Sequence, residues 1–142
     1  GYNKLLRNAE NYTKSRVVMD VISLHVPLTQ QTNNMIAEQQ LRQMKPLATL
    51  INTSRGGVVN EDHLLTALQS GHLSGAAVDV FGEEPYHGPL SGVDTCLLTS
   101  HMGSMSADCR AQMELEATEE AVRLIQGYEL RGTVPDAEYE LR

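Results

Sequence analysis

The chain has 142 residues, of which 41% are hydrophobic and 20% are charged, and its formal net charge is −7. This composition is typical of a globular domain and too apolar for a disordered tail. A chain of this length buries about 68–70% of its unfolded surface, so a hydrophobic core is possible. Binding to nucleic acid is not expected, because it requires many Lys and Arg side chains on phosphates.

Several other classes of protein are also disfavoured. The apolar runs, such as Val21–Ile22 and Val58–Val59, are far too short to cross a bilayer, so no membrane association is expected. Cys96 and Cys109 are too few for a disulfide framework, which favours a reducing, cytoplasmic setting. The five histidines are scattered without metal-ligand spacing, and no metal site is predicted. Because the chain begins at Gly1 without an initiator Met, we expect it to be a piece of a longer protein.

Four apolar segments rich in β-branched residues predict strands, at Val21–Val26, Leu47–Thr53, Ala76–Val80 and Cys96–Thr99. The first three begin about 28 residues apart, close to the length of a strand–helix–strand unit. Their interiors are nearly continuous in apolar character, which is typical of strands covered on both faces of a parallel sheet.

Helical patterns lie between the strands. The segment Ala37–Met44 predicts a short helix before Pro46. Asn60 is a good N-cap for a second helix, and Gly71 is placed to end it.

A long third helix is predicted to run to Gln126, capped by Ser104 or Ser106. Its apolar face comprises Cys109, Met113, Ala117, Ala121 and Leu124. The order β-α-β-α-β-loop-β-α predicts an α/β fold with a parallel sheet.

Ligands of open parallel sheets bind beyond the carboxyl ends of the strands, so the residues that follow each strand are candidates for function. Arg55 follows the second predicted strand, Asp79 and Glu84 follow the apolar part of the third, and His101 follows the fourth. Each has an ordinary structural interpretation: a surface turn for Arg55, a solvated loop for Glu84 and a structural role for His101. Asp79 needs a partner, because a bare charge at the end of an apolar strand is costly to bury.

Together these side chains suit one kind of chemistry. The planar fork of Arg55 can hold a carboxylate, and a histidine next to a glutamate can exchange a hydroxyl proton. The matching substrate has a carboxylate next to a carbonyl or hydroxyl group. A hydride would then move to or from a cofactor such as nicotinamide.

Four stretches resemble the D-isomer-specific 2-hydroxyacid dehydrogenases, the family that includes phosphoglycerate dehydrogenase and the glyoxylate/hydroxypyruvate reductases. They are DVISLHVPLT (20–29), INTSRGGVVNE (51–61), AVDVFGEEP (77–85) and TSHMGS (99–104). The resemblance implies a Rossmann-like fold and hydride transfer between a nicotinamide cofactor and a D-2-hydroxy acid or 2-keto acid.

The resemblance also implies a role for each matching residue. Arg55 would bind the substrate carboxylate, His101 would be the general acid/base, and Glu84 would be its partner. Positions that would contact the cofactor, NAD rather than NADP by preference, are Val26, Thr53, Ser54, Arg55, Asp79, His101, Gly103 and Ser104. Ser100 and Met102 depart from the family pattern, which usually has Pro before the catalytic histidine and a small or aliphatic residue after it.

The family's glycine-rich turn, Gly-x-Gly-x-x-Gly, does not occur in these 142 residues. Residues 1–103 are therefore predicted to form the C-terminal portion of the NAD(P)-binding domain. Residues 104–142 would form a return helix and tail that pack on a substrate-binding domain. The resemblance implies a homodimeric parent enzyme, and the isolated chain is expected to be inactive and to self-associate through the long helix.

A second interpretation is a non-catalytic Rossmann-type binding or assembly module derived from the same family. The joint presence of Arg55, Glu84 and His101 favours the enzyme.

Overall fold

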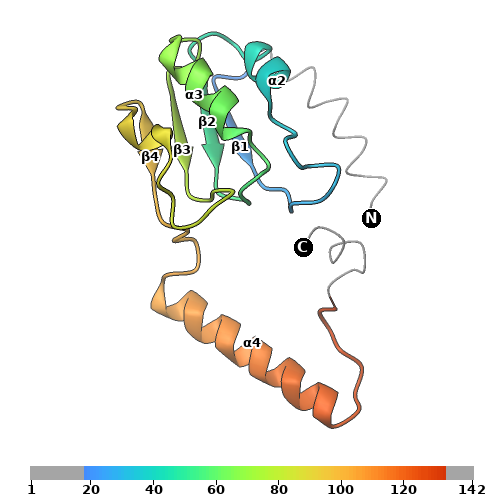
Figure 1. Cartoon of the computed structure of the whole chain (residues 1–142). Helices are drawn as coiled ribbons and strands as arrows, with labels where there is room; N and C mark the ends of the chain where they lie inside the picture. The colour runs from blue at the N-terminus through green and yellow to red at the C-terminus, as the bar shows by residue number, and fades with distance from the viewer. Residues whose placement is uncertain (1–17, 134–142) are drawn as a thin grey trace. The chain divides into compact units, whose positions relative to one another are not determined.

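The computed structural model describes residues 18–133 (Figure 1). They form two compact units, the first over residues 18–101 and the second over residues 102–133. The first unit contains a four-stranded sheet with its helices, and the second contains one long helix. Each unit is described by itself.

The sheet is parallel throughout, as predicted. Its strands are β1 (Val21–Leu24), β2 (Thr49–Asn52), β3 (Gly75–Val78) and β4 (Cys96–Leu98), and they lie side by side in that order. The strands are shorter than the apolar segments. At the start of β2 the reason is local, because Leu47 has a φ of 65°, which lies outside the β region.

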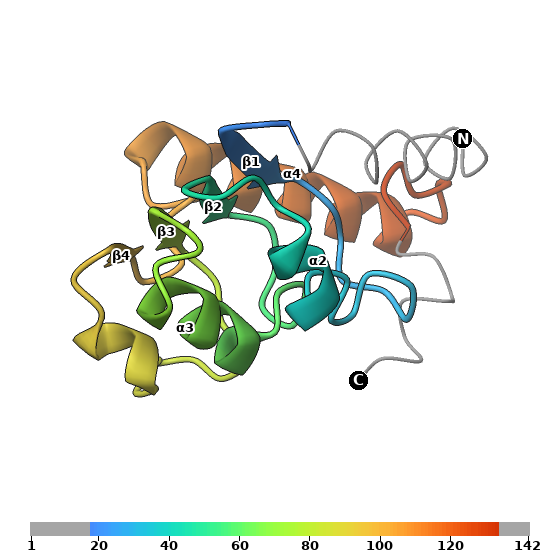
Figure 2. The same cartoon turned by 90° about the horizontal axis from the view of Figure 1, so that it is seen from above.

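Three helical segments connect these strands: α2 (Glu38–Arg42), α3 (Glu61–Gln69) and the 3-10 helix η1 (Pro89–Gly92). Helices α2 and α3 lie on the same face of the sheet (Figure 2). The strand order explains this placement. Right-handed crossovers that always step to the next strand in one direction leave their helices on one side of the sheet.

Within residues 18–101 the expectation that both faces of the strands are covered is wrong. Burial alternates along β2, where Leu50 and Asn52 are buried while Thr49 and Ile51 are half-buried. Strand β3 alternates in the same way. Successive side chains of a strand point to opposite faces, and the connecting helices cover one of those faces.

The core lies between this covered face and the helices. Leu41 of α2, Leu50 of β2 and Leu64 of α3 are each at most 1% exposed. Local signals define the ends of α3 as predicted. The Asn60 side chain accepts a hydrogen bond from the backbone N–H of His63, and Gly71 follows the helix with a φ of 71°.

The second unit contains α4 (Ala107–Ile125). Of the two serines proposed as its cap, Ser106 has this role, since its hydroxyl accepts from the backbone N–H of Cys109 at 3.2 Å. Gly127 follows the helix with a φ of 74°. No residue of α4 is buried; of its predicted apolar face, Cys109 is half-buried and the other four side chains are exposed.

Over residues 18–133, none of the helices has both the length and the apolar character needed to cross a membrane.

Candidate active site

The carboxyl ends of the four strands meet at one edge of the sheet, drawn lowest in the first unit in Figure 1. Three loops leave the sheet there: residues 53–57 after β2, residues 79–85 after β3 and residues 99–101 after β4. The predicted site residues of the first unit lie on these loops, apart from Val26 after β1. The sheet therefore gathers side chains that are far apart in the sequence.

His101 and Glu84 form a pair across two of these loops. The Nδ1 atom of His101 lies 2.9 Å from Oε2 of Glu84. The side chains of His101 and Glu84 are 47% and 37% exposed, so the pair is open to a ligand from solvent. With Nδ1 directed at the carboxylate, Nε2 is the ring nitrogen that can exchange a proton with a substrate.

The second carboxylate oxygen of Glu84 fixes the turn on which the residue lies. Oε1 accepts a hydrogen bond from the backbone N–H of Phe81 at 3.0 Å. This bond, and then the bond with His101, lower the pKa of Glu84 below its usual range, because both favour the charged carboxylate. Glu84 is therefore held as an anion next to the imidazole.

The backbone of His101 is also constrained. Its N–H donates to the carbonyl oxygen of Asp79 at 2.8 Å, and its φ is 53°. This left-handed conformation is uncommon for residues other than glycine. No local pattern in the sequence indicates this conformation.

Asp79 is buried, with 7% exposure, and it has the partner that its position required. The hydroxyl of Thr99 donates to Oδ1 of Asp79 at 2.5 Å. The loop after β4 is thus attached to Asp79 twice, through the Thr99 side chain and the His101 backbone. Asp79 supports the position of His101 in addition to any role toward a cofactor.

Asn52 shapes the loop that contains Arg55. This side chain is 1% exposed, and its Oδ1 accepts from both the backbone N–H and the hydroxyl of Ser54. Its Nδ2 donates to the carbonyl oxygen of Arg55 at 3.1 Å. Sequence reasoning missed Asn52, since a polar residue ending an apolar strand has no distinctive local signal.

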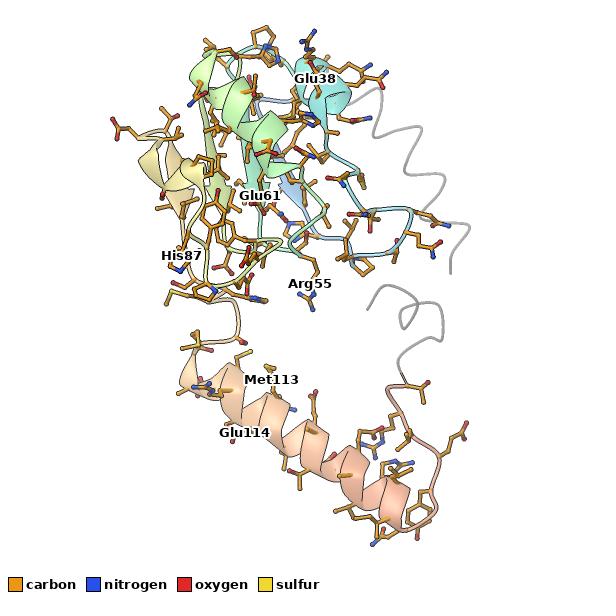
Figure 3. All side chains as sticks on the ribbon, in the orientation of Figure 1. Glu38, Arg55, Glu61, His87, Met113 and Glu114 are labelled. Atoms are coloured by element: carbon orange, nitrogen blue, oxygen red, sulfur yellow. The ribbon has the colours of Figure 1, made fainter. Side chains whose placement is uncertain are left out.

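Arg55 lies at the same sheet edge but is not bonded to the His101–Glu84 pair. The Arg55 side chain is labelled in Figure 3. Its exposed guanidinium donates from Nη1 to the carbonyl oxygen of Ser54 at 2.7 Å. The structure thus joins Glu84 to His101 and places Arg55 on a neighbouring loop with its guanidinium exposed.

The remaining predicted cofactor positions fall in both units. Val26 follows β1 and is half-buried, Thr53 is exposed, and Ser54 is buried. Gly103 and Ser104 follow His101 in the chain and belong to the second unit.

The donor set fits the nicotinamide end of a dinucleotide. The buried carboxylate of Asp79 and the exposed hydroxyl of Thr53 are an acceptor and a donor at strand ends, and they suit the two polar groups of a carboxamide. The same edge has no Gly-x-Gly-x-x-Gly turn, because the sequence contains none. Over residues 18–133, no group of three or more His, Cys, Asp and Glu side chains could hold a metal ion.

These features define a Rossmann-like α/β domain with a polar carboxyl edge. Residues 8–103 match the family model described as "D-isomer specific 2-hydroxyacid dehydrogenase, NAD binding domain". The chain belongs to this family.

Relatives agree with the assignment. The chain is 50% identical over 95 residues to the glyoxylate reductase of Thermococcus litoralis. The aligned region covers 66% of this chain and 29% of the relative. It is 35% identical over 130 residues to the D-3-phosphoglycerate dehydrogenase of Synechocystis sp., and this aligned region covers 87% of the chain and 24% of the relative. Among solved structures, a glyoxylate reductase from Paecilomyes thermophila has a TM-score of 0.82 at 31% identity, covering 88% of this chain and 38% of its own.

The chain spans 29% of the length of this glyoxylate reductase and 24% of the length of this D-3-phosphoglycerate dehydrogenase. The match is therefore to the NAD-binding domain of much longer enzymes.

Proposed function

We propose that this chain forms the proton-transfer and carboxylate-binding part of the active site of an NAD(P)-dependent D-2-hydroxyacid dehydrogenase. The observation that supports this most directly is the 2.9 Å pairing of His101 with Glu84 at the carboxyl edge of the sheet. Family membership and the nearby Arg55 add to it.

The substrate would be a small 2-hydroxy acid or 2-keto acid, such as glyoxylate, hydroxypyruvate or phosphoglycerate. Arg55 would turn its guanidinium from the Ser54 carbonyl to the substrate carboxylate, which it can bind with two parallel hydrogen bonds. This places the neighbouring carbonyl or hydroxyl group toward His101. When bound, the nicotinamide supplies or accepts the hydride.

His101 would donate a proton from Nε2 to the carbonyl oxygen during reduction and accept the hydroxyl proton during oxidation. Glu84 stabilises the protonated ring through Nδ1 and fixes its orientation, as the carboxylate partner of a catalytic histidine does. The left-handed backbone at His101 sets the direction in which the ring leaves its loop.

The nicotinamide end of the cofactor would contact Asp79 and the other predicted positions, which are Val26, Thr53, Ser54, Arg55, His101, Gly103 and Ser104. NAD is favoured, in line with the description of the family model. A solved relative from Xanthobacter autotrophicus was determined with NADPH, so family membership alone does not choose between the two. We infer that residues of the intact enzyme outside this chain bind the pyrophosphate.

We further infer that the intact enzyme is a cytoplasmic homodimer. Cys96 and Cys109 are both free thiols, as expected in a reducing compartment. The homodimer is what the family resemblance implies, and the exposed apolar side chains of α4, Leu124 and Ile125 among them, would be covered by the substrate-binding domain. Residues 104–142 would pack on the substrate-binding domain, while residues 1–103 complete the cofactor domain.

The test is the His101→Ala substitution in the intact enzyme. We expect turnover of a 2-keto acid to fall by roughly 10²–10⁴-fold, the usual contribution of a general acid/base. His72→Ala is the matched control, because His72 precedes β3 and so lies at the amino ends of the strands, away from the candidate site. An unchanged turnover rate in the His101 variant would remove this residue from the mechanism, whereas no turnover by the unsubstituted intact protein would favour the non-catalytic binding or assembly module.

A further inference from the structure

We propose that Glu61 is a positioning residue that holds the turn at residues 81–85, and through it the His101–Glu84 pair, in the productive arrangement. The effect on catalysis rests on the function proposed above, whereas the effect on the turn does not. Glu61 is the first residue of α3 and lies near the carboxyl edge of the sheet (Figure 3).

A single side chain connects α3 to the turn. Oε1 of Glu61 accepts a hydrogen bond from the backbone N–H of Gly82 at 2.8 Å. The two residues are 21 positions apart in the sequence. A hydrogen bond from an N–H group to a charged carboxylate is stronger and more directional than a neutral one. Glu61 therefore sets the orientation of the peptide group that precedes Gly82.

That same peptide group is constrained on its other side. The carbonyl oxygen of Phe81 lies against the Cα atom of Gly56, where an added Cβ would be 1.8 Å from this oxygen. The Phe81 ring stacks on Tyr86, with 4.2 Å between ring centroids. The peptide is thus held between the Arg55 loop and the start of α3.

The peptides on either side of Phe81 link Glu61 to the catalytic pair. The N–H of Phe81 donates to Oε1 of Glu84, whose other oxygen is paired with His101. The N–H of the next residue, Gly82, donates to Glu61. If the Gly82 peptide rotates, the chain that follows it is displaced, and the carboxylate of Glu84 moves away from the Phe81 N–H that orients it.

Helix α3 offers a matched control residue. Asp62 follows Glu61 in the first turn of the helix and is exposed. Both carboxylates are favourable at a helix N-terminus, so a general effect of charge on α3 would be similar at the two positions. The hydrogen bond to Gly82 is made by Glu61.

The experiment compares Glu61→Asp, Glu61→Gln and Asp62→Asn in the 142-residue chain by NMR. Two quantities are measured: the titration of the Glu84 side-chain carboxyl carbon and the amide hydrogen exchange of Phe81 and Gly82. Glu61→Asp keeps the charge at the helix terminus but is one methylene too short, whereas Glu61→Gln keeps an oxygen acceptor at full length.

We expect Glu61→Asp to raise the pKa of Glu84 toward its ordinary value of 4.5 and to speed exchange at both amides about tenfold or more. Glu61→Gln should give intermediate values, because a neutral acceptor of the same length forms a weaker bond than the carboxylate, and Asp62→Asn should change neither quantity. The proposal is overturned if Glu61→Asp behaves like Asp62→Asn, or if Glu61→Gln disturbs the turn more than Glu61→Asp does.

In the intact enzyme, Glu61→Asp should lower kcat with little change in KM, because the imidazole is misdirected while Arg55 still binds the carboxylate. The NMR result does not depend on activity. A disturbed turn in Glu61→Asp alongside full activity of His101→Ala would therefore reject the proposed function and retain the role of Glu61.

Discussion

Glu84 takes part in two hydrogen bonds that each favour its charged form, one from Phe81 and one with His101. The carboxylate is thereby stabilised in the folded chain relative to the unfolded chain, and its pKa is lowered. The contribution of Glu84 to the free energy of unfolding is therefore fully present above its unfolded pKa. It is lost as the pH falls through the lower pKa of the folded state.

Comparison with Glu84→Gln tests this dependence on pH. Glutamine keeps an oxygen for the Phe81 N–H but does not titrate. We expect the native chain to be the more stable of the two at pH 6, and the difference to shrink as the pH falls below about 4.5. Urea unfolding at pH 6, 4.5 and 3 measures it. A difference that stays constant over this range would contradict the role assigned to the charge of Glu84.

Sequence reasoning at this scale was effective where the signal was local or the family motif was specific. It placed Glu84 and His101 at the same sheet edge, and the structure pairs them at 2.9 Å. It missed Glu61 and Asn52, because their hydrogen-bond partners are set by the paths of the loops and not by the adjacent residues in the sequence. No pattern in the sequence links residue 61 to the N–H of Gly82, because the contact arises only after β3 is placed next to β2.

At the scale of elements, the loops after β2 and β3 contact each other through their backbones. An added Cβ on Gly56 would lie 1.8 Å from the Phe81 carbonyl oxygen and 2.7 Å from the backbone nitrogen of Gly82. No flexible side chain is available to move aside, so any substitution at Gly56 must displace one loop. Glycine is required here by space and not by conformation, since the φ of Gly56 lies outside the left-handed region.

Gly56→Ala should therefore destabilise the chain by about 1–3 kcal/mol, the usual range for overpacking. The control is Gly92→Ala, because the added methyl group meets no atom within 4 Å there. That substitution should be close to neutral. Urea midpoints of the two variants measure the effect, and equal midpoints would show that the two loops separate at little cost.

The secondary structure was predictable for a different reason in each element. The cap of α3 at Asn60 and its stop at Gly71 depend on neighbouring residues, and both were predicted correctly. The covering of the sheet was predicted wrongly for residues 18–101. Small and β-branched residues, such as Ala77 and Ile51, give a continuous apolar pattern even on the less covered face of the sheet. The periodicity of apolar residues therefore does not distinguish strands covered on one face from strands covered on both faces.

At the scale of the whole molecule, the 142 residues contain the proposed catalytic side chains but not the turn with which the family binds the cofactor's pyrophosphate. His101, Glu84 and Arg55 are present, whereas the glycine-rich turn is absent from the 142 residues. Proton transfer and hydride transfer must be in register for catalysis. We expect the purified 142-residue chain to show no oxidation of NADH with glyoxylate or hydroxypyruvate, followed by absorbance. Turnover by this chain would contradict this expectation.

The second unit predicts how the isolated chain behaves in solution. Several large apolar side chains of α4 are exposed, including Met113 at 53% and Ile125 at 84%. Such a patch favours association with a second copy. Sedimentation velocity should show a mass that rises with concentration, and the double substitution of Leu124 and Ile125 by Gln should reduce it. A monomer at all concentrations, without binding of a hydrophobic dye, would contradict this.

The backbone contact between Gly56 and Phe81 also limits how such domains can be recombined. A designer who wishes to alter substrate preference by grafting the segment around Arg55 from a relative would import a backbone path shaped for a different partner. Because no side chain can absorb the mismatch, the segment at residues 79–85 has to be exchanged along with it. The two loops form a single unit for engineering, although 25 positions separate Gly56 from Phe81 in the chain.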